Sequence, residues 1–364
     1  MLHVTLVGLI AGGRSGVPRY AAALTNALDH VAQDFPDLSI RLLTTTRGAE
    51  AAGVAHLPID RIDGVFEHAH AGPRRILAEQ IRARGARADL LHFFDLSGPI
   101  LARGRRFVTT IHDAAIRHGF EGARVTHKRL LQPWALRHAT AAVAVSAFAR
   151  AEAVNLFGAD RERIHVIHSG PGLIPAGTPQ GAPPEGSPYL LYVGNFAAHK
   201  NLPFLIEAFG EANVDGRLLL VGGRGDRLEE IRRVASASPA ATRIEIRWDV
   251  SDEELDGLYR GASMLLLPSR YEGFGFTALE AMARGCPVLA SDVPAVREIS
   301  GDGAMLLPVD DRAAWAAAIR RVVGDDHLRE GLRANGAETV RRYSWTATAR
   351  AVCELFLRCR ENPA

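Results

Sequence analysis

The stretch from Pro268 to Ser291 constrains the fold more than any other part of the chain. The apolar run Met264–Leu267 comes directly before it and predicts a buried strand. A short loop follows, and apolar residues at core-facing spacing then predict a helix from about Phe276 to Arg284. Gly285 suits a left-handed helix C-cap, and Val288–Ala290 begins another strand. The stretch therefore predicts a strand–loop–helix–strand unit of a parallel α/β fold.

The same alternation of short apolar runs and helical patterns extends along the rest of the chain, as parallel α/β sheets require. We expect strands at residues 3–9, 38–45, 90–94, 107–111, 141–145, 164–167, 189–193, 218–221 and 244–248. We expect helices at residues 18–32, 73–86, 147–157, 202–209, 227–237, 311–323, 326–341 and 345–360, and another after the capping box of Ser251 and Glu254. Between the two halves, residues 170–188 are rich in Gly and Pro and predict an exposed linker.

The length and composition limit the class of protein. A chain of 364 residues is long enough for two domains of ordinary size. It contains no run of eighteen apolar residues, and its first residues predict a buried strand rather than a signal peptide. The three cysteines follow no metal or disulfide spacing, which favours a reducing compartment. We therefore expect a cytoplasmic protein, with a peripheral position at the inner membrane face as an alternative.

The charge distribution bears on the partners. The net charge is only +2, but basic residues are in excess in the first half. A basic face could meet a membrane surface or an anionic acceptor, although solvated arginines in an arginine-rich chain are the favoured interpretation. No pattern of a nucleic-acid-binding module is present, so we expect no nucleic acid partner. The arginines that carry the excess are Arg74, Arg75, Arg82, Arg84, Arg87, Arg103, Arg105 and Arg106.

The loop before the helix at Phe276 has the chemistry of a ligand site. Gly273 and Gly275 allow the backbone to approach a ligand closely, and a helix N-terminus presents unpaired N–H groups that attract anions such as phosphate. Two carboxylates, Glu272 and Glu280, flank this loop. Ionised carboxylates only accept hydrogen bonds, so they suit the hydroxyl groups of a sugar. Together these features indicate a nucleoside-diphosphate sugar.

These residues carry a resemblance to a known family. Glu272 and Glu280 are separated by seven residues that begin Gly-Phe-Gly, and this string resembles the double-glutamate motif of retaining glycosyltransferases of family 4, or glycosyl transferases group 1. A solvated helix start is the alternative interpretation. The resemblance implies the α/β GT-B fold, in which two Rossmann-like domains with parallel sheets face each other across a cleft. It implies an acceptor domain at residues 1–172, a linker at 173–187, a donor domain at 188–345 and a terminal helix at 346–364 that crosses back to the first domain.

The resemblance also implies roles for individual residues. Glu272 would bind hydroxyls of the donor sugar, Lys200 would bind the diphosphate, and His112, in the string Thr-Ile-His-Asp, would lie beside the transferred sugar. Lys200 is one of only two lysines among 43 basic residues, which supports a specific need for a compact ammonium group. The backbone near Val250 would contact the base, and Glu280 the ribose. The full donor-binding set is Gly13, Gly16, Asn195, Lys200, Val250, Gly273, Phe274, Gly275, Phe276, Thr277 and Glu280.

The sequence departs from the family pattern at two places. Asn195 stands where many relatives have a second phosphate-binding arginine at or near this position, and Arg14, Arg224 and Arg270 are the candidates to replace it. The string His168-Ser169-Gly170-Pro171-Gly172 differs from the family's usual Asn-Gly ending.

The implied reaction is transfer of a sugar from a nucleoside-diphosphate sugar to an acceptor hydroxyl with retention of anomeric configuration. No metal and no cofactor are implied, because protein groups would stabilise the leaving diphosphate. The His-Lys-Asn string at Lys200 resembles relatives that use GDP-mannose; glycan, lipid and small natural-product acceptors all remain open. Two alternatives also remain: another GT-B sugar-nucleotide enzyme, an epimerase or a phosphorylase, and a sugar-nucleotide-binding protein without catalysis.

Overall fold

The chain forms two compact units in the computed structural model. The structure describes residues 1–8, 16–61, 81, 83–101, 104–119, 126–172, 181–182, 188–222 and 227–361. The N-terminal unit comprises Met1–Leu173 together with Tyr343–Ala364, and the C-terminal unit comprises Ile174–Arg342. Gly13, Arg14 and Arg224 lie outside the described residues, as does most of the helix expected at 73–86. No helix among the described residues is long and apolar enough to cross a membrane.

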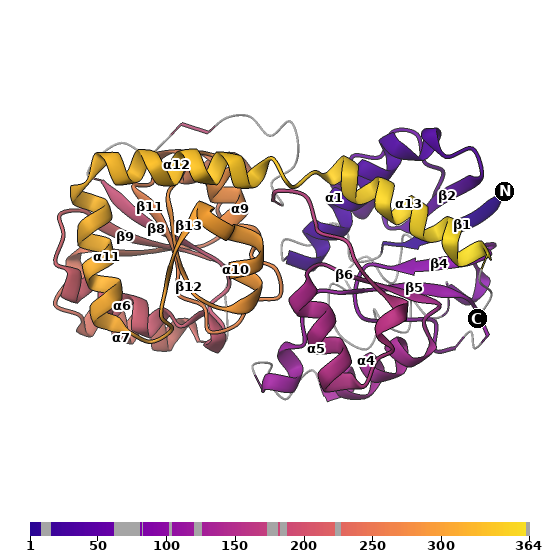
Figure 1. The fold of residues 1–364 in the computed structure, drawn as a ribbon, viewed down its shortest axis with the longest axis horizontal. Helices are drawn as coiled ribbons and strands as arrows, with labels where there is room; N and C mark the ends of the chain where they lie inside the picture. Colours follow the sequence, from indigo (N-terminus) through magenta and orange to yellow (C-terminus); the bar gives the residue numbers. More distant parts are fainter. Residues whose placement is uncertain are drawn as a thin grey trace. The chain divides into compact units, whose positions relative to one another are not determined.

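The N-terminal unit contains a seven-stranded parallel sheet in the order β3-β2-β1-β4-β5-β6-β7 (Figure 1). The chain builds outward from β1 to β3 and then returns to place β4 on the other side of β1. The strand order therefore reverses between β1 and β4, which is the position where open α/β sheets bind ligands. The strands are β1 (Leu2–Val7), β2 (Leu38–Thr44), β3 (Ile59–Arg61), β4 (Leu90–Phe93), β5 (Phe107–Ile111), β6 (Ala141–Ala144) and β7 (Ile164–Val166).

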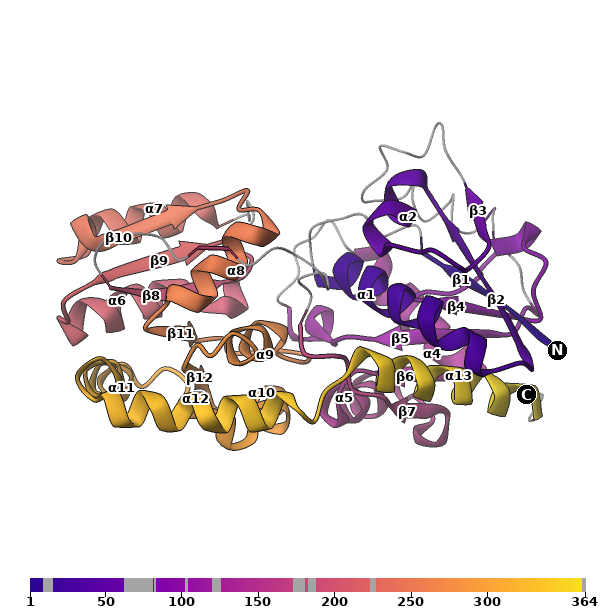
Figure 2. The same cartoon turned by 90° about the horizontal axis from the view of Figure 1, so that it is seen from above.

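Helices cover both faces of this sheet: α1 (Gly16–Val31) and α13 (Trp345–Glu361) lie on one side, and α4 (Thr126–His138) and α5 (Ala147–Phe157) on the other (Figure 1). Helix α2 (Thr46–Ala52) packs on α1 (Figure 2). Helix α5 begins where the Ser146 side chain accepts a hydrogen bond from the Ala149 amide, and it ends at Gly158, whose φ of 65° is left-handed. Helices α2 and α4 were not predicted; Pro133 inside α4 weakens its helical signal.

The terminal helix α13 packs on α1 and on β1 within the N-terminal unit. Its first residue, Trp345, donates a hydrogen bond from Nε1 to the Gly172 carbonyl at 3.0 Å, and its ring contacts the ring of Tyr20 on α1 with centroids 5.6 Å apart. Thr348 donates to the His168 carbonyl at 2.8 Å. The helix thus covers the chain segment that leaves β7.

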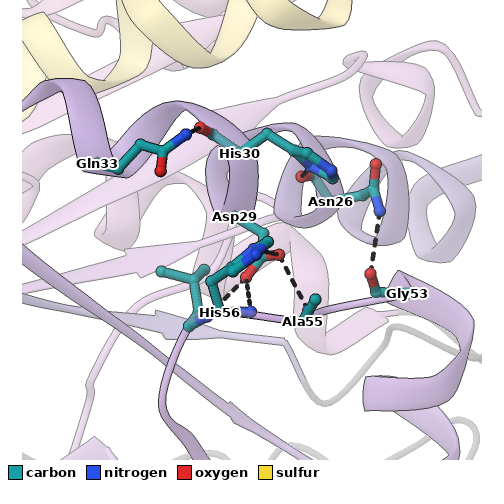
Figure 3. Close-up of polar contacts among 8 residues, drawn as sticks. Asn26, Asp29, His30, Gln33, Gly53, Ala55 and His56 are labelled. Atoms are coloured by element: carbon teal, nitrogen blue, oxygen red, sulfur yellow. Dashed lines mark hydrogen bonds and ion pairs between the residues drawn. The ribbon is translucent and has the colours of Figure 1, made fainter.

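A buried carboxylate fixes the segment between α2 and β3 (Figure 3). The side chain of Asp29, on α1, accepts hydrogen bonds from the amides of Ala55, His56 and Leu57 at 2.9, 2.9 and 2.6 Å. It also contacts Nδ1 of His56 at 2.9 Å. Burial acts to raise the pKa of Asp29, but these hydrogen bonds outweigh burial and hold the pKa below its ordinary value. The Asp29 carboxylate is therefore structural: its charge is stabilised by three backbone amides and by His56, and it fixes this segment to α1.

The C-terminal unit contains a six-stranded parallel sheet in the order β10-β9-β8-β11-β12-β13. Here the order reverses between β8 and β11, because the chain first builds outward to β10 and then returns to the other side of β8. The strands are β8 (Tyr189–Val193), β9 (Arg217–Val221), β10 (Ile244–Arg247), β11 (Met264–Leu267), β12 (Val288–Ser291) and β13 (Ala304–Leu307). The edge strand β13 was not predicted.

Helices also cover both faces of the second sheet: α6 (Leu202–Ala212), α7 (Leu228–Ala237) and α11 (Arg312–Gly324) lie on one side, and α9 (Phe276–Met282) and α10 (Pro294–Ser300) on the other (Figure 1). Helix α8 (Asp252–Gly261) packs on α9, and α12 (Asp326–Val340) packs on α9 and β13 (Figure 2). The core between the sheet and the first group of helices includes Trp315, which is fully buried. The Ser251 hydroxyl accepts from the Glu254 amide at 3.0 Å, as expected of the cap of α8.

Two local expectations need correction. Helix α9 ends at Met282, two residues before the expected end, because a turn toward Gly285 (φ 68°) begins there. The segment expected to be an exposed linker is partly buried: Gly170 lies under the ring of Trp345, and Gly181 lies against α8 and donates its N–H to Asp256 at 3.2 Å. A Cβ atom at Gly181 would lie 1.9 Å from the Glu253 carbonyl oxygen, so only glycine fits there.

Candidate functional site

The strand order of the C-terminal unit places two of the expected site residues next to each other. Lys200 lies in a short 3-10 helix (Ala198–Lys200) after β8, and Glu272 lies in the loop after β11. Both strands are parallel neighbours, so their carboxyl ends meet at one edge of the sheet. This edge, between β8 and β11, is where the strand order reverses and where ligands bind in open α/β sheets.

Lys200 and Glu272 form an ion pair at this edge. The Nζ of Lys200 lies 2.6 Å from Oε1 of Glu272, and the Ser269 hydroxyl donates to the same oxygen at 2.6 Å. Both side chains are largely buried, with exposed fractions of 16% and 12%. Burial acts to raise the pKa of Glu272, but Lys200, with Ser269, holds it below its ordinary value. Glu272 is therefore a carboxylate at neutral pH, and it can only accept hydrogen bonds.

The pair leaves part of its hydrogen-bonding capacity unused. Lys200 and Ser269 both donate to Oε1 of Glu272, and Oε2 has no donor among the described residues. Lys200 has three N–H groups, and only the one toward Glu272 has an acceptor in the part of the chain that the structure describes. One carboxylate oxygen and two ammonium hydrogens are thus available to a ligand at the switch point, the sheet edge between β8 and β11 where the strand order reverses.

The glycine loop connects Glu272 to helix α9. Gly275 occupies the N-cap position with φ of 112°, a conformation that L-residues with a side chain rarely adopt. The amides of Phe276 and Thr277 stand in the first turn, where no carbonyl of the same helix can accept their hydrogen bonds. Gly273 and Phe274 complete the loop, and the rings of Phe274 and Phe276 pack with centroids 4.6 Å apart.

Glu280, one turn further along α9, is held by a buried tyrosine. The hydroxyl of Tyr259, on α8, donates to Glu280 Oε2 at 2.8 Å, and both residues are almost completely buried. Arg284 supports the corner formed by Tyr259 and Glu280. Its Nη1 donates to the Glu280 carbonyl at 3.2 Å, and its guanidinium lies 5.8 Å from the centroid of the Tyr259 ring. Asp256 in turn accepts a hydrogen bond from Arg284 at 2.7 Å. The second glutamate is therefore fixed in one orientation before any ligand arrives.

The other expected donor-binding positions differ in their surroundings. Asn195 is exposed, and its carbonyl accepts a hydrogen bond from the Tyr192 hydroxyl at 2.8 Å. Val250 follows Asp249, whose φ of 58° turns the chain after β10. Arg270, one of the candidates for the second phosphate-binding arginine, contacts Asp310 through Nε and Nη2 at 2.8 to 3.1 Å.

His112 and Gly16 belong to the N-terminal unit. His112 follows β5, and its Nε2 donates to the Phe94 carbonyl at 2.8 Å, which leaves Nδ1 as the acceptor. Its ring meets the edge of the Tyr20 ring with centroids 4.6 Å apart. Burial lowers the pKa of His112, against the opposing effects of the Phe94 carbonyl, Asp113 and Asp95, so the imidazole is neutral at pH 7. Gly16 is the first residue of α1.

Sequence reasoning missed two residues of the site. Ser269 comes three residues before Glu272, so its position in the loop was a usable signal. Tyr259 precedes Glu280 by 21 residues and lies on another helix, so only the fold brings them together. Among the described residues, no three His, Cys, Asp or Glu side chains come together in a group that could hold a metal ion.

Comparisons with known proteins identify the family. The model of glycosyltransferase family 4 matches residues 14–171, and that of glycosyl transferases group 1 matches residues 177–339. O-antigen chain mannosyltransferase B of Escherichia coli is 30% identical over 262 residues, which are 67% of this chain and 68% of that protein. The chain is a family 4 glycosyltransferase. A second relative of this glycosyltransferase, D-inositol 3-phosphate glycosyltransferase of Nocardioides sp., is 30% identical over 358 residues, with 83% of this chain and 78% of that protein covered.

The fold of the glycosyltransferase agrees with this assignment. The solved structure of HepE from Anabaena, in complex with UDP and glucose, superposes with a TM-score of 0.74 at 17% identity and covers 98% of this chain and 100% of that one. The two Rossmann-like units with parallel sheets are those of the GT-B fold, which confirms the fold class and the family predicted from the double-glutamate string.

Proposed function

We propose that this glycosyltransferase moves a sugar from a nucleoside-diphosphate sugar to an acceptor hydroxyl with retention of configuration. The observation that carries the proposal is the buried contact of Lys200 with Glu272 at the switch point of the second sheet. A cation and a carboxylate that lie side by side suit one ligand that has a charged centre and hydroxylated flanks. A nucleoside-diphosphate sugar has this combination of groups.

Under this proposal, each residue of the site would bind one part of the donor. The two remaining N–H groups of Lys200, with the amides of the Gly273–Thr277 loop, would bind the diphosphate. Oε2 of Glu272 would accept hydrogen bonds from the hydroxyls of the transferred sugar, and Glu280 would bind those of the ribose. The backbone at Val250, after the turn at Asp249, would contact the base.

The chemistry depends on charge that develops on the leaving diphosphate. Lys200 and the loop amides would stabilise this charge without a metal, because hydrogen-bond donors held in place by the fold need no reorganisation when the charge develops. The acceptor would attack on the face from which the diphosphate leaves, and a leaving phosphate oxygen would take the acceptor proton, which gives retention. His112, neutral and with Nδ1 as an acceptor, would bind a hydroxyl of the transferred sugar.

The donor class can be tested by thermal stability. We propose GDP-mannose as the donor, since the His-Lys-Asn string favours it and an E. coli relative is a mannosyltransferase by name. In a panel of GDP-, UDP-, dTDP- and ADP-sugars, GDP-mannose is expected to raise the Tm most, because a ligand that binds only the folded state stabilises it by mass action. Free mannose should have no effect. A larger rise in Tm with another nucleotide sugar would identify that sugar as the donor in place of GDP-mannose. If no member of the panel raises the Tm, the proposal that the protein binds a nucleotide sugar is wrong.

The role of Tyr259 gives a further test. Tyr259→Phe removes only the hydroxyl that orients Glu280, and is expected to raise the KM for the donor about fivefold to tenfold with little change in kcat. The reason is that Glu280 would bind the ribose equally in the ground state and the transition state. Tyr189→Phe is a matched control, because it also removes one buried tyrosine hydroxyl, which donates to the Leu258 carbonyl at 2.8 Å and to no donor-binding residue. An unchanged KM in Tyr259→Phe would show that Glu280 does not bind the donor.

A further inference from the structure

A basic groove lies at the outer edge of the sheet in the N-terminal unit. Strand β7 is the last strand in the sheet order, three strands beyond β4 and the switch point. Helices α5 and α13 lie on opposite faces of the sheet (Figure 1), and a residue of α5 and two of α13 line the groove beside β7. The groove has a volume of about 410 Å³. Its lining comes from α5, from the turn before β7, from β7 itself and from α13, and the polar side chains in it are Arg150, Arg161, Glu162, His165 and Arg358.

The side chains of the three arginines in this groove have no acidic partner among the described residues. Within the part of the chain that the structure describes, the guanidinium groups of Arg150, Arg161 and Arg358 form no hydrogen bond and no ion pair. By contrast Arg163, which lies one residue before β7, pairs with Asp160 at 3.5 Å. Three guanidinium groups therefore face one carboxylate, that of Glu162, and the groove has a net positive charge.

The pKa of His165, which lines the groove, responds to the charges of these arginines. Its imidazole is half-buried, and burial is the main cause that lowers its pKa. The charges of Arg358 and Arg150 lower the pKa of His165 further, and Glu162 opposes them. Arg150 on α5 and Arg358 on α13 thus act on the same side chain, and a protonated imidazole would add to a positive charge that the single carboxylate of Glu162 does not balance.

The backbone of the edge strand adds a hydrogen-bond donor. The Ile167 amide bonds to the Ala144 carbonyl of β6 at 3.0 Å. Since backbone N–H groups alternate in direction along a strand, the Val166 amide points away from β6, toward the open edge. Val166 lines the groove as well. An anion there would meet guanidinium forks and a backbone amide together.

We propose that this groove binds a phosphate-bearing anion. Arginine is the side chain that matches phosphate geometry with paired N–H donors, and three arginines from three chain segments converge here. The volume exceeds that of inorganic phosphate, so a phosphate ester fits: a soluble phosphorylated molecule or the headgroup of an anionic lipid. The site is distinct from the donor site, since it consists only of residues of the N-terminal unit and does not depend on Lys200 or Glu272.

The proposal is tested on the full chain by NMR of the histidine imidazoles, with the His165 signal assigned by its loss in His165→Gln. Inorganic phosphate is expected to raise the apparent pKa of His165, because a bound anion favours the imidazolium. In the double variant Arg150→Gln/Arg358→Gln, phosphate affinity is expected to fall about tenfold or more. Without phosphate, the pKa of His165 should already be higher in that variant, because two positive charges are gone. Arg163→Gln removes a neighbouring arginine that does not line the groove, and should behave as wild type.

Two controls distinguish specific phosphate binding from a general effect of ionic strength, and a lipid headgroup from a soluble phosphate ester. If chloride at the same ionic strength raises the pKa of His165 as much as phosphate, or if the double variant binds phosphate as wild type does, the groove is not a phosphate site. Sedimentation with vesicles of phosphatidylcholine, alone or mixed with phosphatidylglycerol, distinguishes the sources. Binding only to the mixed vesicles, and loss of that binding in the double variant, assigns a lipid headgroup. A phosphate response without vesicle binding assigns a soluble phosphate ester.

Discussion

Lys200→Ala is expected to lower kcat/KM by about 10² to 10³, because one preorganised donor to a developing negative charge is typically worth this factor. Glu272→Gln should cause a loss of similar size, since it replaces the carboxylate that orients Lys200 and would bind the sugar hydroxyls. The two changes are expected to be far from additive, because each removes half of one buried pair. Steady-state kinetics of the two single variants and the double variant measure both effects.

The pH dependence of Lys200→Ala distinguishes a lost charge from a damaged site. In the wild-type protein, Lys200 holds the pKa of Glu272 below its ordinary value against the effect of burial. Without Lys200, burial should raise the pKa of Glu272 above that value, so residual activity should decline as the pH falls from about 7 to 5 while wild-type activity stays nearly constant. A pH–rate profile parallel to that of wild type would contradict this account.

The control for both variants removes a charged side chain of the C-terminal unit that lies outside the site. Arg312→Ala removes an exposed cation that pairs with Glu207 and Glu211, and should leave turnover unchanged. The circular dichroism spectra of all variants should match that of wild type. Normal turnover in both Lys200→Ala and Glu272→Gln, with donor binding intact, would remove the proposed mechanism.

Much of this site could be predicted from local patterns. The apolar run Met264–Leu267, the glycines of the loop and the C-cap at Gly285 specify a strand, a tight turn and a helix within about twenty residues, and the structure has these elements in these places. Lys200 was identifiable because it is a rare residue type in this chain at a loop–helix junction. Their meeting follows from the strand order, which brings β8 beside β11.

What the sequence could not show depends on contacts between distant segments. Arg270 was a candidate for phosphate binding, but Asp310, forty residues later, fixes its guanidinium in this structure. Tyr259 supports Glu280 only because α8 packs on α9. Gly181 looked like linker glycine, yet its N–H is bound to Asp256 on α8. Side-chain partners across elements are set by tertiary packing, which local periodicity does not encode.

Asp256→Ala is expected to destabilise the C-terminal unit by about 3 to 5 kcal/mol, the cost of breaking a buried ion pair by removing one partner. The Asp256 side chain is 5% exposed and accepts hydrogen bonds from Arg260 and Arg284 at 2.7 Å each, and from Gly181. Burial acts to raise the pKa of Asp256, but the two arginines hold it below its ordinary value. Its contribution to stability is therefore complete above about pH 4, the unfolded pKa, and is lost as the pH falls through the lower folded value.

Urea unfolding followed by hydrogen exchange of peptides from α8 and α9 measures this loss within the C-terminal unit alone. Asp292→Ala, which removes an exposed ion pair with Arg297, is the matched control and should change stability little. The double variant Asp256→Leu/Arg284→Met should recover most of the loss, since it replaces two buried charges by apolar side chains of similar size. If Asp256→Ala unfolds at the same urea concentration as wild type, then Arg260 and Arg284 become solvated without cost. Asp256 then does not stabilise the corner formed by Tyr259 and Glu280. If the double variant is as unstable as Asp256→Ala, the lost contact with Gly181, rather than the uncompensated Arg284, sets the cost.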